Sequence, residues 1–329
     1  MNMIARALWS CMTIAGLILA AVLPASGEEV RLRVNTFPGP QNLGLFVAQD
    51  KGLLAKRGLS VEIGFTPSSQ AQREGLVKGA FEIAQAGVDN AVALVDVAKQ
   101  PVVIVAGGSN GMNQLIVRPE VKSYDDIRGK TVVVDAPNTA YAFLLYKMLA
   151  VKGVARGEYA VLPTGGCTQR LNAMREDNAR VAAMMNPPCN LFAAKDGYRS
   201  LGRATDVVGA YQADGIWVMR PWASSNGETL VKYLQAAIEG YRWGADPANR
   251  REAAAIVGKH LKLDDEIAAK SVEAALGSNG GLAKDAQFDT EGFKNTLRLR
   301  AEFEGGDANP TPDKYLDLSY YQRALSSLK

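Results

Sequence analysis

Short runs of apolar residues alternate along this chain with longer segments in which apolar residues recur every three or four positions. The short runs predict β-strands, and the longer segments predict amphipathic α-helices. Up to residue 108 the predicted strands cover residues 30–37, 60–67, 81–87 and 101–108, with one helical segment between each pair. Strands that alternate with helices are typical of a mainly parallel sheet with helices on both faces.

The same alternation resumes near residue 113, and the chain becomes mostly helical after residue 225. We therefore predict an α/β fold with two lobes, each built on an open, mainly parallel sheet. Lobe I takes residues 28–113, lobe II takes residues 114–220, and residues 221–329 form a helical return to lobe I and a C-terminal tail. The predicted strands at 114–118 and 215–220 would connect the lobes as a two-strand hinge.

The first 27 residues have the pattern of a cleaved secretory signal peptide. Arg6 precedes an apolar run that ends in small residues. A transmembrane anchor is the alternative, but the run is short for a bilayer and no charged stop follows it. We therefore expect the mature chain in the periplasm.

Composition narrows the possible partners. Apolar residues make up 47% and charged residues 22% of the chain, which is typical of a soluble globular protein. The formal net charge of +3 becomes +2 when the signal peptide removes Arg6. A nearly neutral chain without a basic cluster argues against binding to nucleic acid or to an anionic membrane.

The most prominent catalytic pattern is "GGSNG" at residues 107–111, which matches the G-x-S-x-G of a hydrolase nucleophile elbow. Such an elbow requires a helix directly after the serine, whereas a strand is predicted here. The single histidine, His260, stands at a charged helix end far along the chain. The elbow therefore lacks two of its parts, and a secreted hydrolase with Ser109 as nucleophile is only the alternative hypothesis. We expect no metal and no cofactor, because no metal-ligand spacing or nucleotide-binding motif occurs.

Small and polar residues recur instead where predicted strands end and helices begin, as in "TFPGPQN", "TPSSQ", "AGVDN", "DAPNT", "PTGGCT" and "MNPPCN". Helix N-termini attract anionic and polar groups through their free N–H groups. Each of these segments taken alone is explained by helix capping. Several that face one another across a hinge predict a ligand-binding cleft, because ligands of open α/β sheets bind at the carboxyl ends of the strands.

Four side chains near these segments are further candidates. Phe37, Tyr141 and Trp217 stand near predicted strand ends and could hold a planar or apolar part of a ligand between them. Asp214, at the second crossing between the lobes, could bind an amine or hold the hinge by hydrogen bonds.

Two cysteines remain after cleavage, Cys167 and Cys189. An even pair in an oxidising compartment is compatible with a disulfide. Two buried free thiols are equally compatible with the sequence, and the two alternatives stay open here.

The order of several motifs resembles the periplasmic substrate-binding proteins of ABC importers. Within them the chain is similar to the NMT1/THI5-like branch, which holds binders of taurine, alkanesulfonates, nitrate and thiamine-pyrimidine precursors. The resemblance rests on "LGLFVAQDKGLLAKRGLSVEI", "QREGLVKGAFEIAQAGVDNAV", "IVRPEVKSYDDIRGKTVVV" and the tail "YLDLSYYQRAL". It implies a type II periplasmic-binding-protein fold that closes about its hinge on a small solute and has no catalytic step.

The resemblance also implies a ligand wall in each lobe. The expected lobe I wall is Phe37, Gln41, Asn42, Ser68, Ser69, Gln70 and Asp89, and the expected lobe II wall is Asn138, Thr139, Tyr141 and Asn186. Arg73 and Arg170 are possible partners of a carboxylate. The implied partners are a small sulfonate-, aromatic-acid- or pyrimidine-like solute and a membrane permease, with the receptor itself a monomer. A sensor subunit that presents its ligand to a membrane kinase would share this fold.

Overall fold

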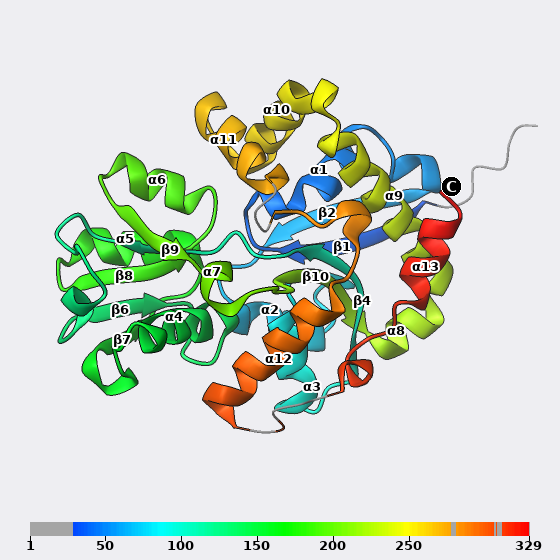
Figure 1. Cartoon of the computed structure of the whole chain (residues 1–329). Coiled ribbons are helices and arrows are strands. Elements are labelled where there is room, and N and C mark those ends of the chain that lie inside the picture. Colours follow the sequence, from blue (N-terminus) through cyan, green and yellow to red (C-terminus); the bar gives the residue numbers. More distant parts are fainter. Residues whose placement is uncertain (1–28, 278–280, 306, 308–310, 329) are drawn as a thin grey trace, which may run out of the picture.

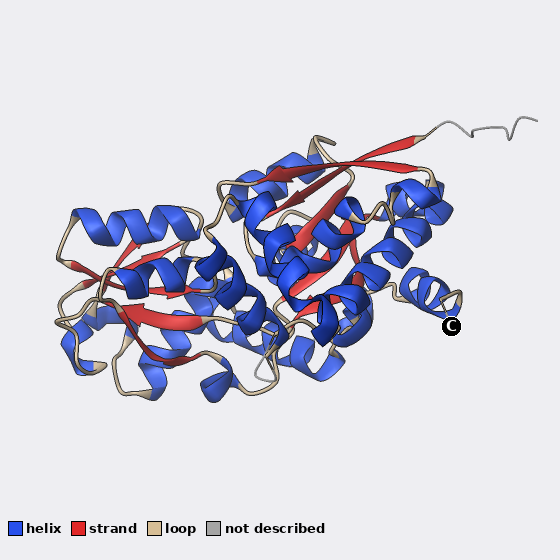
Figure 2. Cartoon of the chain, turned by 90° about the horizontal axis from the view of Figure 1, so that it is seen from above, coloured by secondary structure: helices blue, strands red, loops and turns tan. Residues whose placement is uncertain are grey.

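A computed structural model describes residues 29–277, 281–305, 307 and 311–328. The expected signal peptide lies outside these residues. Within the described ranges, no helix is both long enough and apolar enough to cross a membrane. The chain forms two lobes side by side, each with a sheet between helices (Figures 1 and 2).

Lobe I is built on a five-stranded sheet with the order β2-β1-β3-β10-β4. Its strands are β1 (Val30–Thr36), β2 (Leu59–Phe65), β3 (Ile83–Gly87), β4 (Val102–Ser109) and β10 (Asp214–Met219). Strands β1, β2 and β3 are parallel, whereas β10 runs antiparallel to both β3 and β4.

Lobe II is built on a second five-stranded sheet with the order β7-β6-β8-β5-β9. Its strands are β5 (Gln114–Val117), β6 (Thr131–Val134), β7 (Ala160–Pro163), β8 (Arg180–Met185) and β9 (Arg199–Arg203). Strand β6 is parallel to β7 and β8, and β5 is antiparallel to β8 and β9. Each sheet is therefore mixed, because the strand that follows a crossing between the lobes enters its sheet in the opposite direction.

The two crossings are short connections rather than strands shared between the sheets. Residues 110–113 lead from β4 into β5, and residues 209–213 lead back into β10. Of the two expected hinge strands, β5 belongs to the sheet of lobe II and β10 to the sheet of lobe I. The chain is therefore back in lobe I from residue 214, before the boundary predicted at residue 220. Gln212 holds the return crossing, since its buried amide donates to the Asp214 carbonyl at 2.6 Å.

The helices of lobe I include three that follow its strands and several from the C-terminal part. The first group is α1 (Leu43–Asp50), α2 (Ser69–Val77) and α3 (Val88–Asp96); the second is α8 (Arg220–Ser225), α9 (Gly227–Ala245), α10 (Arg250–Leu261), α11 (Asp265–Leu276) and α13 (Ser319–Ser326). Helices α1 and α9 approach so closely that a Cβ on Gly240 would lie only 2.0 Å from the carbonyl oxygen of Gly44. The helical return to lobe I is thus fixed by backbone contact at these two glycines.

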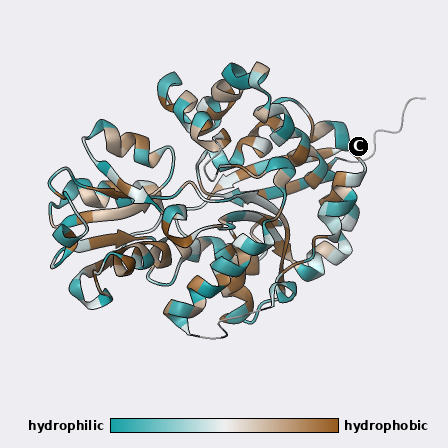
Figure 3. Ribbon diagram, in the orientation of Figure 1, coloured by the Kyte–Doolittle hydropathy of each residue, from teal (hydrophilic) through white to brown (hydrophobic). Residues whose placement is uncertain are grey.

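Lobe II carries α4 (Ala140–Val151), α5 (Cys167–Glu176), α6 (Cys189–Lys195) and α7 (Thr205–Val208). Apolar side chains concentrate in the sheets and on the inner faces of the helices in both lobes (Figure 3). Helix α4 is apolar nearly throughout and packs under the lobe II sheet with Leu144, Leu145 and Met148 fully buried.

Helix α12 (Thr290–Glu304) ties the two lobes together a third time (Figure 1). Phe293 and Leu297 pack in the core of lobe I, whereas Leu299 packs in the core of lobe II. Arg300 donates to the Asp89 carboxylate of α3 at 2.8 Å, and its guanidinium lies 5.6 Å from the ring centre of Phe143 in α4. The C-terminal part therefore contacts both lobes and not lobe I alone.

We predict that Arg300→Ala lowers the free energy of unfolding by about 3–5 kcal/mol, because it leaves the buried Asp89 carboxylate without its cation. Arg298→Ala is the matched control: Arg298 is exposed on the same helix, and its loss should cost within about 0.5 kcal/mol. Urea unfolding of both variants measures the difference. Equal small losses would show that the α12 ion pair adds nothing to stability.

Candidate ligand-binding site

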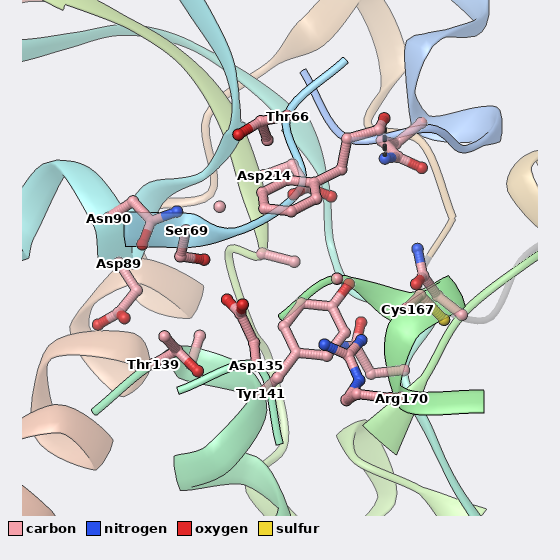
Figure 4. A pocket seen from close by; sticks show the side chains of 18 of the residues that line it. Thr66, Ser69, Asp89, Asn90, Asp135, Thr139, Tyr141, Cys167, Arg170 and Asp214 are labelled. Carbon is pink, nitrogen blue, oxygen red and sulfur yellow. Dashed lines mark hydrogen bonds between the residues drawn. The ribbon is translucent and has the colours of Figure 1, made fainter. Parts of the chain in front are cut away.

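A cavity of about 360 Å³ lies between the two lobes. Its wall is made almost entirely of residues at the carboxyl ends of strands and at helix starts, together with the two crossings (Figure 4). The polar and aromatic members are Phe37, Gln41, Phe65, Thr66, Ser69, Asp89, Asn90, Asn113, Asp135, Thr139, Tyr141, Cys167, Thr168, Gln169, Arg170, Asn186, Tyr211 and Asp214. This is where open α/β sheets bind their ligands.

The corner after β1 contributes Phe37 and Gln41 to the cavity wall. The Gln41 amide nitrogen donates to the Phe37 carbonyl at 3.2 Å, while its buried Oε1 has no partner. Asn42 was expected in the same wall but lies fully buried behind it. Its side chain accepts from the Thr36 hydroxyl at 2.7 Å and donates to the Phe37 carbonyl at 2.8 Å, so it shapes the corner instead of lining it.

The start of α2 separates three residues that the sequence analysis grouped together. Ser69 lines the cavity, as does the preceding Thr66. Ser68 is the N-cap of α2, where its hydroxyl accepts from the Ala71 amide at 3.1 Å. Gln70 is exposed and donates to Glu74 at 2.9 Å, so Ser68 and Gln70 are absent from the cavity wall.

Asp89 and Asn90 reach the cavity from the start of α3. One oxygen of Asp89 pairs with Arg300, and the other is buried without a partner. Arg73 lies behind this wall, where it donates to the Asn90 side chain at 3.1 Å. Burial lowers the pKa of Arg73 although Asp89 opposes that shift.

The loop between β6 and α4 supplies Asp135 and Thr139, and the first turn of α4 supplies Tyr141. Asn138 was expected here too, but it is exposed and lies outside the cavity wall. Burial raises the pKa of the Tyr141 hydroxyl far above its usual range, so this group stays protonated. Asn186, at the end of β8, completes the expected lobe II set.

Arg170 lines the cavity from α5 and is only 3% exposed. Its Nη1 donates to the Gly165 carbonyl at 2.8 Å, its guanidinium lies 4.9 Å from the Tyr141 ring centre, and its Nε has no partner. Among the described residues no carboxylate pairs with it. Arg170, considered from sequence only as a possible anion partner, is therefore a cation that faces the cavity.

Asp214 lies at the return crossing and lines the cavity. Burial raises its pKa to about 6, although the Ser109 hydroxyl donates to its carboxylate at 2.5 Å. Trp217, three residues further on, was expected at the ligand but is fully buried in the core of lobe I. Both faces of strand β10 are buried under other elements, so the Trp217 side chain cannot reach the cavity. Its indole N–H donates to the Ala86 carbonyl at 3.3 Å.

Ser109 has none of the surroundings of a nucleophile. It is the last residue of β4, it is fully buried, and its hydroxyl is committed to Asp214. His260 lies on α10, where it contacts Asp50 at 2.9 Å and stacks on the Phe46 ring. The elbow pattern at 107–111 is thus the end of a strand and a crossing between the lobes.

Cys167 and Cys189 are the first residues of α5 and α6, and the structure holds both as free thiols. Of the two alternatives that the sequence left open, the structure therefore has the free thiols. Burial opposes ionisation of Cys167, but the hydrogen bond with Cys189 and the nearby Arg170 charge lower the pKa of Cys167 to about 7. The same hydrogen bond, with burial, raises the pKa of Cys189.

The lobes touch directly at the edge of the cavity. The Gly166 amide of lobe II donates to the Pro67 carbonyl of lobe I at 2.8 Å. A Cβ on Gly166 would lie 3.1 Å from that same oxygen, so a side chain here would have to push the Pro67 carbonyl back by a few tenths of an ångström. Lys195 of α6 also reaches Asp264 and Glu266 beside α11, at 3.4 and 3.5 Å. The arrangement is that of a closed cleft.

A family model described as NMT1/THI5 like matches residues 39–249, which is more than half of the chain. The chain belongs to the NMT1/THI5-like family. No match was found among curated proteins. Solved structures agree on the fold: the periplasmic nitrate-binding protein NrtA from Synechocystis PCC 6803 is 15% identical, with a TM-score of 0.76 over 91% of this chain and 89% of that one.

Two further structures show how widely the fold is used. The alkanesulfonate-binding protein SsuA from Xanthomonas axonopodis pv. citri, bound to MOPS, is 15% identical, with a TM-score of 0.70 over 88% of this chain and 97% of that one. The desulfurization enzyme DSZB is 11% identical, with a TM-score of 0.63 over 91% of this chain and its full length. At these identities the likeness establishes the fold alone: a periplasmic-binding-protein fold that binding proteins share with the enzyme DSZB.

Sequence reasoning missed several residues of the cavity wall. Thr66, Asn90 and Asp135 lie in the quoted segments "TPSSQ", "AGVDN" and "DAPNT" but were not selected, although their place at the carboxyl end of a strand could have identified them. Asn113 and Tyr211 lie on the two crossings. Nothing local marks these two, because only the packing of the lobes brings them to the cavity.

The raised pKa of Asp214 predicts a pH dependence of stability. A folded-state pKa near 6, above the ordinary 3.8, means that the folded state is favoured while the carboxyl is protonated. Stability should therefore fall as pH rises from about 4 to 6, by up to about 3 kcal/mol from this group. Urea unfolding of the wild type and Asp214→Asn across this range isolates the effect, with the exposed Asp206→Asn as control. Parallel pH profiles for wild type and Asp214→Asn would contradict it.

The free thiols predict selective chemistry. In the native protein, iodoacetamide should alkylate Cys167 and spare the buried Cys189, with a rate that rises through about pH 7, because the thiolate is the reactive form. Peptide mass mapping identifies the modified residue, and Cys167→Ser should abolish native labelling. The denatured, unreduced mature chain should show two thiols; none would mean that the pair is bridged in solution.

Proposed function

We propose that this protein is the extracytoplasmic solute receptor of an ABC importer and binds a small organic solute between its lobes. The observation that carries the proposal is the set of buried polar atoms without partners. Four of them belong to the cavity wall: Gln41 Oε1, Asp89 Oδ2, Asp135 Oδ1 and Arg170 Nε. Burying such groups unpaired is costly, and a bound polar solute would supply the missing partners.

Closure supports the same reading. The Gly166–Pro67 contact and the Lys195 ion pairs join the lobes around the cavity, while the two crossings and α12 leave a defined axis for opening. A ligand that contacts both walls favours the closed state through its extra contacts there. The closed shape would then be what a membrane permease recognises. In this proposal the chain is exported to the periplasm, works as a monomer and serves transport.

An enzyme is the second candidate function, because DSZB has the same fold. Against it stands Ser109, which is buried and bonded to Asp214, with no histidine beside it in the described part of the chain. The receptor proposal therefore includes no catalytic step. A ligand-presenting sensor subunit would share the binding mode; retrieval of a permease rather than a kinase by the ligand-bound protein separates the two.

We expect a thermal-shift screen of the mature chain with sulfonates, aromatic acids, pyrimidines and nitrate to yield a stabilising compound. At about 100 times its Kd, a ligand adds about 2.7 kcal/mol to the free energy of unfolding. Mass spectrometry of small molecules released from the natively purified protein is the parallel route. If nothing is released, no compound raises Tm, and a fluorophosphonate probe labels Ser109, the receptor proposal fails.

A matched pair of variants then tests closure on that compound. Gly166→Leu should weaken binding measured by calorimetry, because its side chain meets the Pro67 carbonyl across the cleft. Gly157→Leu is the control in the same lobe, since nothing lies within 4 Å of its Cβ position. Equal affinities for the two variants would mean that binding does not require the lobes to meet.

A further inference from the structure

Two charged side chains of the cavity wall, both in lobe II, make no ion pair with a carboxylate or a basic side chain in the part of the chain that the structure describes. Asp135 and Arg170 lie on opposite sides of the Tyr141 ring (Figure 4). They are 6% and 3% exposed. The other carboxylates of the wall are engaged, since Asp89 pairs with Arg300 and Asp214 accepts from Ser109. Among its described residues the cavity therefore has one cation and one anion without an ion-pair contact.

The Arg170 side requires an anion. Its guanidinium contacts the Gly165 carbonyl, the Tyr141 ring and the Cys167 thiol, but no carboxylate of the described chain. A buried charge without a partner is strongly unfavourable. The planar guanidinium presents several parallel N–H donors, which fit the paired oxygens of a carboxylate or a sulfonate.

The Asp135 side requires a hydrogen-bond donor. Among the described residues, no hydrogen bond or ion pair reaches its carboxylate, and its Oδ1 is buried without a partner. Arg73 acts on it only through space, without an ion-pair contact. The Oδ2 of Asp89 also lacks a partner and lies in the same wall, so two carboxylate oxygens need donors here. An ammonium group satisfies such an end best.

An aromatic ring lies between the two charges, and other apolar side chains belong to the same wall. The Tyr141 ring separates Asp135 from Arg170, and Phe37, Leu144 and Tyr211 are further members of the wall. Aromatic rings favour a flat partner in stacked or edge-on contact.

From this arrangement we infer that the solute is a zwitterionic organic acid with a flat apolar body, its carboxylate or sulfonate on Arg170 and its ammonium on Asp135. The inference rests on the proposed receptor function and selects one class of solute within it. A bare inorganic anion would leave Asp135 without a partner. A neutral pyrimidine would leave Arg170 without one.

A matched set of ligands tests the inference on the wild-type protein. The set is 4-(aminomethyl)benzoate, 4-methylbenzoate and 4-methylbenzylamine, with 3-(aminomethyl)benzoate and 4-(aminomethyl)benzenesulfonate to vary the spacing and the acid. Calorimetry should show that the best zwitterion binds at least about tenfold more tightly than the ligand that lacks either charge, since a charge-assisted hydrogen bond contributes about 1.5–3 kcal/mol.

Two variants assign each charge to its residue. Asp135→Asn should lower the affinity for the zwitterion to that for 4-methylbenzoate and leave the affinity for 4-methylbenzoate unchanged. Arg170→Gln should lower the affinity for the zwitterion to that for 4-methylbenzylamine and leave the affinity for 4-methylbenzylamine unchanged. Arg170→Lys replaces this variant if the glutamine variant does not fold. Asp206→Asn, an exposed carboxylate of lobe II, is the control and should change no affinity.

The outcomes separate this inference from the receptor proposal. If 4-methylbenzoate or 4-methylbenzylamine binds as tightly as every zwitterion, the inference is wrong and the receptor remains. The same holds if no member of the set binds while the wider screen yields a solute without both charges. Absence of any bound solute in every assay overturns both.

Discussion

The arrangement of this protein depends on where two short crossings leave the lobes. Residues 110–113 and 209–213 hold the carboxyl ends of two separate sheets against one cavity, so strand ends from both lobes share one space. Gln212 and Asp214 fix the return crossing by hydrogen bonds.

Helix α12 limits how the lobes can move about those crossings. It places Leu297 in one core and Leu299 in the other, and Arg300 connects α3 with α4. In the proposed receptor, opening would bend the chain around α12 and separate the edge where Gly166 contacts Pro67 and Lys195 contacts Asp264 and Glu266. A receptor that opens at this one edge would enclose a solute by a single movement of one lobe relative to the other.

The charged side chains of the cavity wall differ in whether the protein itself supplies a partner for them. Asp89 is neutralised by Arg300, and Asp214 shares a hydrogen bond with Ser109 and is easily protonated. Arg170 Nε and Asp135 Oδ1 are buried without hydrogen-bond partners, and neither side chain makes an ion pair within the described chain. Structural charges are usually paired when buried, so charges left unpaired at a cavity wall indicate the chemistry of what binds there.

The sequence by itself determined the alternation of strands and helices, the two-lobe plan, and the strand ends where a ligand would bind, because these follow from local apolar periodicity and capping residues. It also led to Gln41, Asp89 and Tyr141, which the structure places at the cavity. Only the tertiary structure decided which neighbour at each strand end faces inward: Asn42 turns into the corner, Asn138 turns out, and Asp135 turns in. It likewise decided that β10 and β5 run antiparallel and that Trp217 belongs to the core. The physical reason is that side-chain direction and strand pairing depend on contacts between residues far apart in the chain, such as Arg300 with Asp89, which no local pattern encodes.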